Sequence, residues 1–216
     1  LYFTYPQFGA ARAPELDGDR TIHPVVIVGA GPVGMTAALT LAKYGVRSLV
    51  LDAKPTFNDG SRATCIARQS FHIFEQVGAV DAFLAKSLGW TTGRSYFRGR
   101  EIYRLTMPDS ENEKFRPMYN LEQQYTEQFL FDACMATGRV DFRWQSEVTA
   151  TAPRPDGVTL TVSSPHGVYG LEAAWVLAAD GARSPIRGQL GLRLRGDNYE
   201  GRYVIADVKM DHDYPT

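Results

Sequence analysis

Three glycines, Gly29, Gly31 and Gly34, have the G-x-G-x-x-G spacing through which a polypeptide can bind a dinucleotide. The first glycine permits a tight turn, the second lets a pyrophosphate approach the backbone, and the third lets a helix pack closely on a strand. The N-terminus of that helix offers unpaired N–H groups and a partial positive charge to phosphates. The spacing therefore predicts binding of a dinucleotide through its pyrophosphate.

An acidic residue follows the glycines at the end of the next predicted strand. There the carboxylate of Asp52 can accept hydrogen bonds from an adenosine ribose. This arrangement favours a ribose without a 2′-phosphate, so FAD or NAD fits better than NADP as the resident ligand. Pro32 falls in the first helical turn, where a proline loses no hydrogen bond.

The elements that must position these residues follow from the apolar pattern. Residues 25–28 are a β-branched run typical of a buried parallel strand, and residues 46–51 form a second strand. Between them a helix ends at Gly45, and its apolar face comprises Met35, Ala38, Leu39 and Ala42. Two alternatives stay open: an α/β unit that binds no nucleotide, and a membrane span. The glycines and Pro32 disfavour a span, because they interrupt an apolar run that is only just long enough.

Length, charge and cysteine content exclude several classes of protein. The 216 residues can bury a substantial core in one or two domains, and a formal net charge of −1 gives no electrostatic reason to propose nucleic acid or an anionic membrane as a partner. Cys65 and Cys134 have no metal-ligand spacing, so we expect free thiols in a reducing cytoplasm and no metal site. No secretory signal precedes the first strand. Because the chain opens on Leu1, we expect its true start to be missing or processed.

The segments flanking this unit hold aromatic residues and arginines. Residues 1–21 form an aromatic N-terminal arm that either packs on the domain or a neighbour, or is disordered. After Asp52 a loop leads to a helix at 69–77, with Phe71, Phe74 and Val77 on its buried side. Arg62 and Arg68 are spaced so that one could return to the dinucleotide and pair with phosphate oxygens. Taken alone, each arginine is a solvated surface charge.

The middle of the chain contains an insertion and a long helix. We expect a short helix at 80–88, a loop- and strand-like segment at 89–118, and a solvated charged turn at 109–114. Asn120 opens a helix that ends at Gly138, and its buried face comprises Tyr125, Phe129, Leu130 and Ala133. Gln123 either completes a capping box with Asn120 or directs its amide at the hydroxyls of a ligand.

Four short β runs follow, at 140–144, 148–151, 158–162 and 168–173. A separate small apolar strand at 174–178 then runs into Asp180 and Gly181. Ligands of open α/β sheets bind at the carboxyl ends of strands, so Asp180 is a candidate ligand-binding residue. The alternative is an ordinary turn residue before a glycine.

Taken together, these pieces resemble the FAD-dependent aromatic hydroxylases of the para-hydroxybenzoate hydroxylase type. The closest likeness is to 3-(3-hydroxyphenyl)propionate hydroxylases and related phenol-ring hydroxylases. Four motifs carry the resemblance, in family order over residues 22–190: VVIVGAGPVG with Asp52, SRAT at 61–64, NLEQQYTEQFL from Asn120, and VLAADGARSPIR at 176–187. In that family the SRAT arginine contacts the flavin, the glutamine contacts the ribityl chain, and the Asp-Gly pair serves both the flavin and the nicotinamide cofactor.

The resemblance implies an α/β fold: a Rossmann-like FAD-binding domain with a parallel sheet, helices and an antiparallel β-meander, then the start of a β-sheet substrate domain. The implied domains are an arm at 1–21, the FAD-binding domain at 22–191 with the 89–118 insertion, and the substrate domain from 192, with a first strand at 203–209. The implied cofactor contacts are Gly29, Gly31, Pro32, Val33, Gly34, Asp52, Ala53, Arg62, Ala63, Gln123, Val148, Asp180 and Gly181.

The implied activity is hydroxylation of a phenolic substrate with NADH or NADPH and O₂, through a flavin C4a-hydroperoxide. A homodimer is compatible with the resemblance. The family's later Gly-Asp-Ala-Ala-His segment is missing, because Gly196 and Asp197 are followed by Asn198 and Tyr199. We therefore expect an N-terminal portion of a longer enzyme, with its catalytic acid or base beyond residue 216. Another flavoenzyme (an epoxidase, halogenase or reductase) and a non-catalytic nucleotide-binding module stay open as alternatives.

Overall fold

The structure is a computed structural model that describes residues 3–59, 64–197, 199–202 and 211. Its contacts divide the chain into two compact units. The first comprises Leu1–Asp59 and Glu127–Asn198, and the second comprises Gly60–Thr126 and Tyr199–Thr216. The domain boundaries expected at residues 21 and 191 stay predictions. The strand expected at 203–209 lies outside the described residues.

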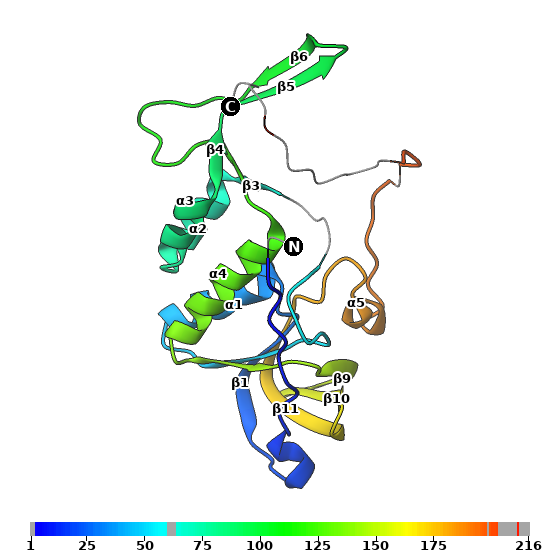
Figure 1. Cartoon of the computed structure of the whole chain (residues 1–216). Helices are drawn as coiled ribbons and strands as arrows, with labels where there is room; N and C mark the ends of the chain where they lie inside the picture. The colour runs from blue at the N-terminus through cyan, green and yellow to red at the C-terminus, as the bar shows by residue number, and fades with distance from the viewer. Residues whose placement is uncertain (1–2, 60–63, 198, 203–210, 212–216) are drawn as a thin grey trace. The chain divides into compact units, whose positions relative to one another are not determined.

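The first unit is built on a six-stranded sheet in the order β8-β2-β1-β11-β10-β9. The neighbours among β8, β2, β1 and β11 are parallel, whereas β11, β10 and β9 form an antiparallel meander (Figure 1). Their bounds are Ile22–Val28 for β1, Ser48–Leu51 for β2, Val140–Arg143 for β8, Glu147–Arg154 for β9, Gly157–Ser164 for β10 and Gly167–Ala178 for β11. The predicted α/β class, with a parallel sheet and an antiparallel meander, is confirmed.

One strand connects the two parts of this sheet. The sequence predicts separate strands at 168–173 and 174–178, but the structure has a single strand, β11. Its first part pairs antiparallel with β10, up to Ala173 opposite Val158. From Glu172 to Ala178 it pairs parallel with β1. The prediction of two strands is wrong because a strand with partners on both sides needs no break where its pairing changes from one neighbour to the other.

The predicted buried faces of the two long helices differ in outcome. Of the face predicted for residues 120–138, Leu130 is buried, but Tyr125, Phe129 and Ala133 are only half-buried, because the buried face follows Glu127, Leu130 and Cys134. Helix α1 (Pro32–Lys43) buries Met35, Ala38, Leu39 and Ala42, as the spacing predicts. The chain leaves α1 through Gly45, whose φ of 79° suits glycine. Helix α4 (Gln123–Ala136) contacts α1, because the Cys134 thiol donates a hydrogen bond to the Met35 carbonyl at 3.5 Å. Helix α5 (Pro185–Gln189) places Ile186 in a core with Val28, Leu51 and Leu160.

The membrane-span alternative is wrong, because residues 22–51 fold as a strand, a 12-residue helix and a second strand. Within the described ranges, no helix combines the length and apolar character that crossing a membrane requires.

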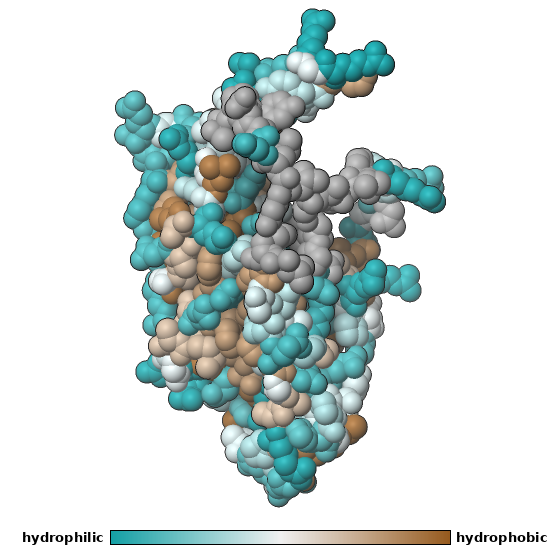
Figure 2. All heavy atoms as spheres, in the orientation of Figure 1, coloured by the Kyte–Doolittle hydropathy of each residue, from teal (hydrophilic) through white to brown (hydrophobic). Residues whose placement is uncertain are grey.

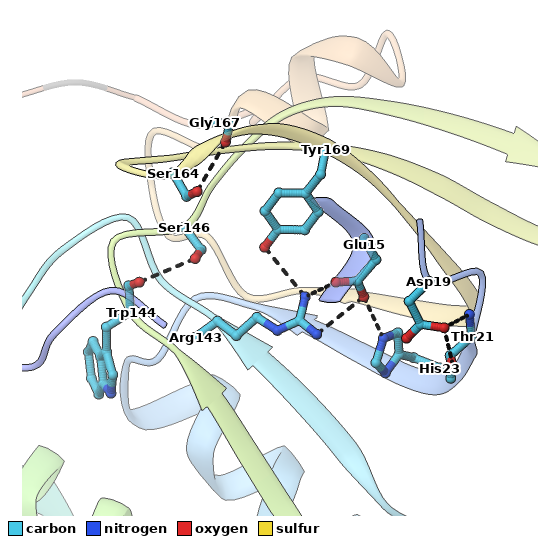
Figure 3. A network of polar contacts seen from close by, with 10 residues as sticks. All are labelled: Glu15, Asp19, Thr21, His23, Arg143, Trp144, Ser146, Ser164, Gly167 and Tyr169. Carbon is cyan, nitrogen blue, oxygen red and sulfur yellow. Dashed lines mark hydrogen bonds and ion pairs between the residues drawn. The ribbon is translucent and has the colours of Figure 1, made fainter. Parts of the chain in front are cut away.

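The N-terminal segment, from Phe3 onward, packs on the first unit. The Phe8 ring stacks on Trp144 with ring centroids 4.3 Å apart. The backbone N–H of Phe8 donates a hydrogen bond to the Pro55 carbonyl at 2.7 Å. A 3₁₀ helix, η1 (Pro14–Asp17), carries Glu15, which accepts hydrogen bonds from Arg143 at 2.9 and 3.2 Å and contacts His23 at 3.1 Å (Figure 3). Of the two alternatives for the arm, packing is therefore correct for its described residues.

The described residues of the second unit include a three-stranded sheet, the helices α2 and α3, and a hairpin. The sheet order is β3-β7-β4, with bounds Cys65–Ala67, Met118–Asn120 and Leu88–Trp90 respectively. Helices α2 (Arg68–Gln76) and α3 (Val80–Lys86) bury Phe71, Phe74 and Phe83, and Phe71 stacks on Tyr119 at 3.8 Å. Strands β5 (Thr92–Phe97) and β6 (Arg100–Thr106) form a hairpin that exposes both hydrophilic and hydrophobic side chains (Figure 2).

Several local expectations for this part of the chain are wrong. Asn120 does not open a helix; it lies in β7, and its amide oxygen accepts hydrogen bonds from the Trp90 indole at 2.8 Å and the Cys65 thiol at 3.4 Å. The capping-box alternative for Gln123 therefore fails, and α4 starts at Gln123 itself.

The 109–114 turn is not merely solvated, because Asp109 pairs with Arg68 and with Arg116. The helix at 80–88 ends two residues early, at Lys86. Val77 is half-buried.

Candidate dinucleotide site

The glycine turn lies between β1 and α1. Gly29 has a φ of 108°, and its N–H donates to the Leu51 carbonyl at 2.8 Å. A Cβ at Gly29 would lie 2.4 Å from the carbonyl oxygen of Ala179, far inside van der Waals contact. Position 29 requires glycine because the chain leaving β11 passes directly across it. The same contact brings the Asp180 segment to the glycine turn.

Gly34 is required by the packing of the helix on the strand. A Cβ there would lie 2.0 Å from the carbonyl oxygen of Gly29 and 3.2 Å from the side chain of Ile27. Any larger residue would push α1 away from the end of β1. This is the close approach that the third glycine of the motif predicts.

Gly31 differs from the other two glycines. Its φ of −80° and ψ of −179° are extended values that any residue adopts, and a Cβ there would meet no described atom within 4 Å. Neither backbone strain nor packing against the described residues requires this glycine. Gly31 stands at the N-terminus of α1, where no side chain of the described residues caps the helix and no acidic residue lies in the first turn. The backbone here is accessible to an anion such as a pyrophosphate.

Asp52 lies against the glycine turn. Its Oδ2 accepts a hydrogen bond from the Ala30 N–H at 2.8 Å, and its Oδ1 accepts one from the Lys54 N–H at 2.9 Å. These bonds fix the carboxylate beside the helix N-terminus. Because each carboxylate oxygen has a second lone pair, both can still accept a hydrogen bond from a hydroxyl. The arrangement suits a ribose next to a pyrophosphate.

Asp180 and Gly181 line a cavity next to the turn. Gly181 has a φ of 83°, and the Asp180 Oδ2 accepts hydrogen bonds from the Ser184 hydroxyl at 2.8 Å and the Ile186 N–H at 3.3 Å. Asp180 therefore also stabilises the turn that leads into α5, which agrees with the alternative that it is an ordinary turn residue before a glycine. Among the described residues, its Oδ1 accepts no hydrogen bond. The cavity has a volume of about 400 Å³ and is lined by Val33, Ala178, Ala179, Asp180, Gly181, Ser184, Ile186, Arg187, Leu190 and Leu192.

The remaining predicted contacts are placed differently. Ala53 directly follows Asp52, and the Asp52 carbonyl accepts a hydrogen bond from Ser146 N–H at 2.8 Å, which brings the start of β9 beside it. Val148 is buried in the core of the first unit, so only its backbone on the edge strand β9 is left to contact a ligand. Gln123 lies in the first turn of α4, within the second unit. Arg62 and Ala63 lie outside the described residues.

Two features escaped sequence reasoning. Ser184, Arg187, Leu190 and Leu192 line the cavity but belong to no predicted contact set. Glu127 on α4 is also missing from the prediction, although it is only 1% exposed. A signal for it exists: Glu127 lies three residues before Leu130 and seven before Cys134, both buried, so helical spacing puts a carboxylate on the buried face. In the described part of the chain, no group of three His, Cys, Asp or Glu residues could hold a metal ion.

Comparison with known proteins identifies the family. Residues 23–216 match the family described as FAD binding domain. The chain therefore belongs to the FAD binding domain family. Its six-stranded sheet, glycine turn and Asp52 are the parts with which such a domain binds a dinucleotide.

Relatives with curated names include a 3-(3-hydroxy-phenyl)propionate/3-hydroxycinnamic acid hydroxylase from Mycolicibacterium smegmatis. It is 30% identical over 87% of this chain and 33% of its own length. Among solved structures, p-nitrophenol 4-monooxygenase PnpA from Pseudomonas putida superposes with a TM-score of 0.76 and 28% identity, over 82% of this chain and 46% of that one. The flavin-dependent monooxygenase PieE, solved with FAD and substrate, has a TM-score of 0.73 and 26% identity, over 82% of this chain and 33% of that one. The chain thus spans about a third to a half of the length of these proteins.

Proposed function

We propose that the whole protein is an FAD-dependent monooxygenase that hydroxylates a phenolic ring with NADH or NADPH and O₂. The observation that carries the proposal is the set of backbone and carboxylate groups at the glycine turn that can still bind a ligand. Gly31 leaves open backbone at the N-terminus of α1, and Asp52 is held beside it. The relatives described above, which carry the names of a hydroxylase and of monooxygenases, support the choice of reaction.

In this proposal each part of the site binds one part of the cofactor. The N-terminus of α1, with Gly31, Pro32 and Val33, binds the pyrophosphate. The Asp52 carboxylate accepts hydrogen bonds from the ribose, while the backbones of Ala53 and Val148 contact the adenosine. Asp180 and Gly181 border the cavity beside the turn and serve the flavin and the passing nicotinamide. Arg62, Ala63 and Gln123 are predicted flavin contacts.

The chemistry that FAD supplies when bound is acceptance of a hydride from NAD(P)H and activation of O₂ for transfer of one oxygen atom to the ring. The residues described here bind and orient; none is assigned as a catalytic acid or base. Asp52, held by the Ala30 and Lys54 N–H groups, is preorganised to receive the ribose without rearrangement.

The test uses the purified full-length protein. We expect a yellow protein with a flavin spectrum that bleaches when NADH or NADPH is added without O₂. In air, phenols such as 3-hydroxyphenylpropionate and para-nitrophenol should stimulate NAD(P)H oxidation, with one labelled oxygen atom from O₂ appearing in the product. A colourless protein that takes up no FAD would reject the proposal in favour of a non-catalytic module. Bleaching without stimulation by any phenol would point instead to an epoxidase, a halogenase or a reductase.

A further inference from the structure

A buried carboxylate on α4 holds one distant residue of the first unit. The Oε2 of Glu127 accepts a hydrogen bond from the Asn58 N–H at 2.7 Å, and its Oε1 accepts one from the Asn58 Nδ2 at 2.6 Å. The Glu127 side chain is almost completely buried. Placing a carboxylate in the interior is costly unless hydrogen bonds compensate it, and an apolar residue would cost less on a buried helix face. The carboxylate therefore calls for an explanation beyond stability.

The residue that Glu127 holds belongs to the loop that begins at Asp52. Lys54 joins the two ends of this loop, because its N–H donates to the Asp52 Oδ1 at 2.9 Å and its Nζ contacts the Asn58 Oδ1. A continuous path of hydrogen bonds thus runs from Glu127 through Asn58 and Lys54 to the carboxylate of Asp52. Asp52 is the residue that faces the glycine turn, through its bond with the Ala30 N–H.

The same loop has a second, apolar anchor. Phe57 is buried, and its ring packs against Phe8 at 5.4 Å and Phe131 at 5.7 Å between centroids. Phe131 lies one helical turn after Glu127 on α4. The aromatic contacts can keep the loop folded if the Glu127 hydrogen bonds are lost. We therefore expect the loss of these bonds to alter the position of the loop more than the stability of the fold.

We infer that Glu127 is a positioning residue for the dinucleotide site: it fixes the 53–59 loop through Asn58 and so sets the orientation of Asp52 toward the ribose. This inference rests on the proposed function, since the ligand is taken to be FAD. Glu127 itself touches no ligand in this account. Its effect on Asp52 runs through Asn58 and Lys54, so each step of this path can be tested.

The test measures FAD affinity of the flavin-stripped, full-length protein by quenching of flavin fluorescence, together with thermal melting of the apoprotein. Glu127→Gln places an amide donor opposite the Asn58 Nδ2, and Asn58→Asp places a second carboxylate opposite Glu127. Each change should weaken FAD binding roughly tenfold, as expected for one lost charge-assisted hydrogen bond. In the double variant the amide of residue 127 can donate to the carboxylate of residue 58, so affinity should return to within about threefold of wild type.

Two further variants separate an effect on the position of Asp52 from a general loss of stability. Lys54→Met interrupts the path to Asp52, and Glu172→Gln is the control. Lys54 is exposed, and its replacement keeps its N–H bond to Asp52 but cuts the path, so FAD binding should weaken by roughly fivefold with unchanged melting. Glu172 lies in the middle of β11, opposite the start of β1, where it contacts Thr159 and Arg154. Its replacement should leave FAD affinity within about twofold of wild type.

Unchanged affinity in Glu127→Gln, or a double variant no better than the single ones, would overturn the inference. If Glu127→Gln fails to fold, Lys54→Met decides, and unchanged FAD affinity in that variant overturns it. A wild-type protein that binds no FAD overturns the proposed function and this inference with it. Normal FAD binding in all variants overturns the inference alone.

Discussion

At the scale of single residues, the three glycines of one motif are glycine for different reasons. Gly29 is required by the chain leaving β11 and by its positive φ, and Gly34 by the contact between α1 and β1. Gly31 is required by neither, because its backbone angles suit any residue and no described atom lies near its missing Cβ. The open space at position 31 is compatible with the close approach of a ligand to the backbone, which the motif predicts.

This difference leads to a prediction for Gly31→Leu. The side chain would occupy the approach path of the pyrophosphate, so flavin loading should fall below about one tenth of wild type. The apoprotein should melt nearly as wild type, because the change costs less than about 1 kcal/mol at a helix N-cap. Flavin absorbance per protein and thermal melting measure the two effects.

Gly170→Leu is the matched control, because Gly170 in β11 also has open space around its missing Cβ but lies away from the turn. It should keep full flavin loading. Gly34→Ala should instead destabilise the apoprotein by about 1–3 kcal/mol through overpacking. A Gly31→Leu protein that retains its flavin would contradict the assignment of the turn.

At the scale of elements, a buried ion pair holds η1 on the sheet. Glu15 and Arg143 are both largely buried, and Arg143 also approaches the Tyr169 hydroxyl at 3.5 Å (Figure 3). Burial by itself raises the pKa of Glu15, but hydrogen bonds from Arg143, its own backbone N–H and His23 outweigh it, so the pKa lies below its ordinary value. Since Arg143 ends β8 and its carbonyl accepts a hydrogen bond from the Asp52 N–H, η1 supports the strand that adjoins the site.

The pH dependence of stability follows from this lowered pKa. A carboxyl group whose pKa is lower in the folded state stabilises the protein above its unfolded pKa of about 4.3, and this contribution disappears as the pH falls through the folded value. We expect Glu15→Gln to cost about 3 kcal/mol at pH 7, because it breaks a buried pair. Its unfolding free energy should also fall less steeply than wild type below about pH 4. Urea unfolding at several pH values measures both effects. If the unfolding free energies of the variant and of wild type ran parallel with pH, the lowered pKa of Glu15 would be contradicted.

At the scale of the whole molecule, the chain folds as two compact units. The first contains the glycine turn, Asp52 and Asp180, so most of the predicted dinucleotide contacts depend on the integrity of a single unit.

The two cysteines lie in different units and differ in burial. Cys65 is exposed, whereas Cys134 is buried between α4 and α1, where burial raises the pKa of its thiol to about 12.

Thiol labelling should therefore report on opening of the first unit. At pH 8 the Cys65 thiol should react readily because it is exposed. Cys134 should react only when α4 separates from α1, because it is buried and burial raises the pKa of its thiol. FAD should slow labelling of Cys134, because a ligand of the native state stabilises it. Mass spectrometry of the labelled full-length protein distinguishes the two sites. A labelling rate of Cys134 that FAD leaves unchanged would contradict this picture.

The sequence by itself determined the elements whose residues are close together in the chain. The glycine turn, α1, β2 and Asp52 lie within 30 residues, where glycine spacing and apolar periodicity act directly on the backbone. The sequence also indicated that Asp180 lies at the same edge of the sheet as the glycine turn, because parallel strands bring their carboxyl ends to one edge. The structure places Ala179, the residue before Asp180, against Gly29.

Only the tertiary structure decided the contacts between distant residues. Glu127 holds Asn58 across 69 positions, Asp109 pairs with Arg68 across 41, and β11 is one strand because two neighbours share it. Such contacts leave no periodic trace in the sequence, since a polar side chain finds its partner only after the elements have packed. The residues that orient the site are therefore harder to predict than the residues that form its turn.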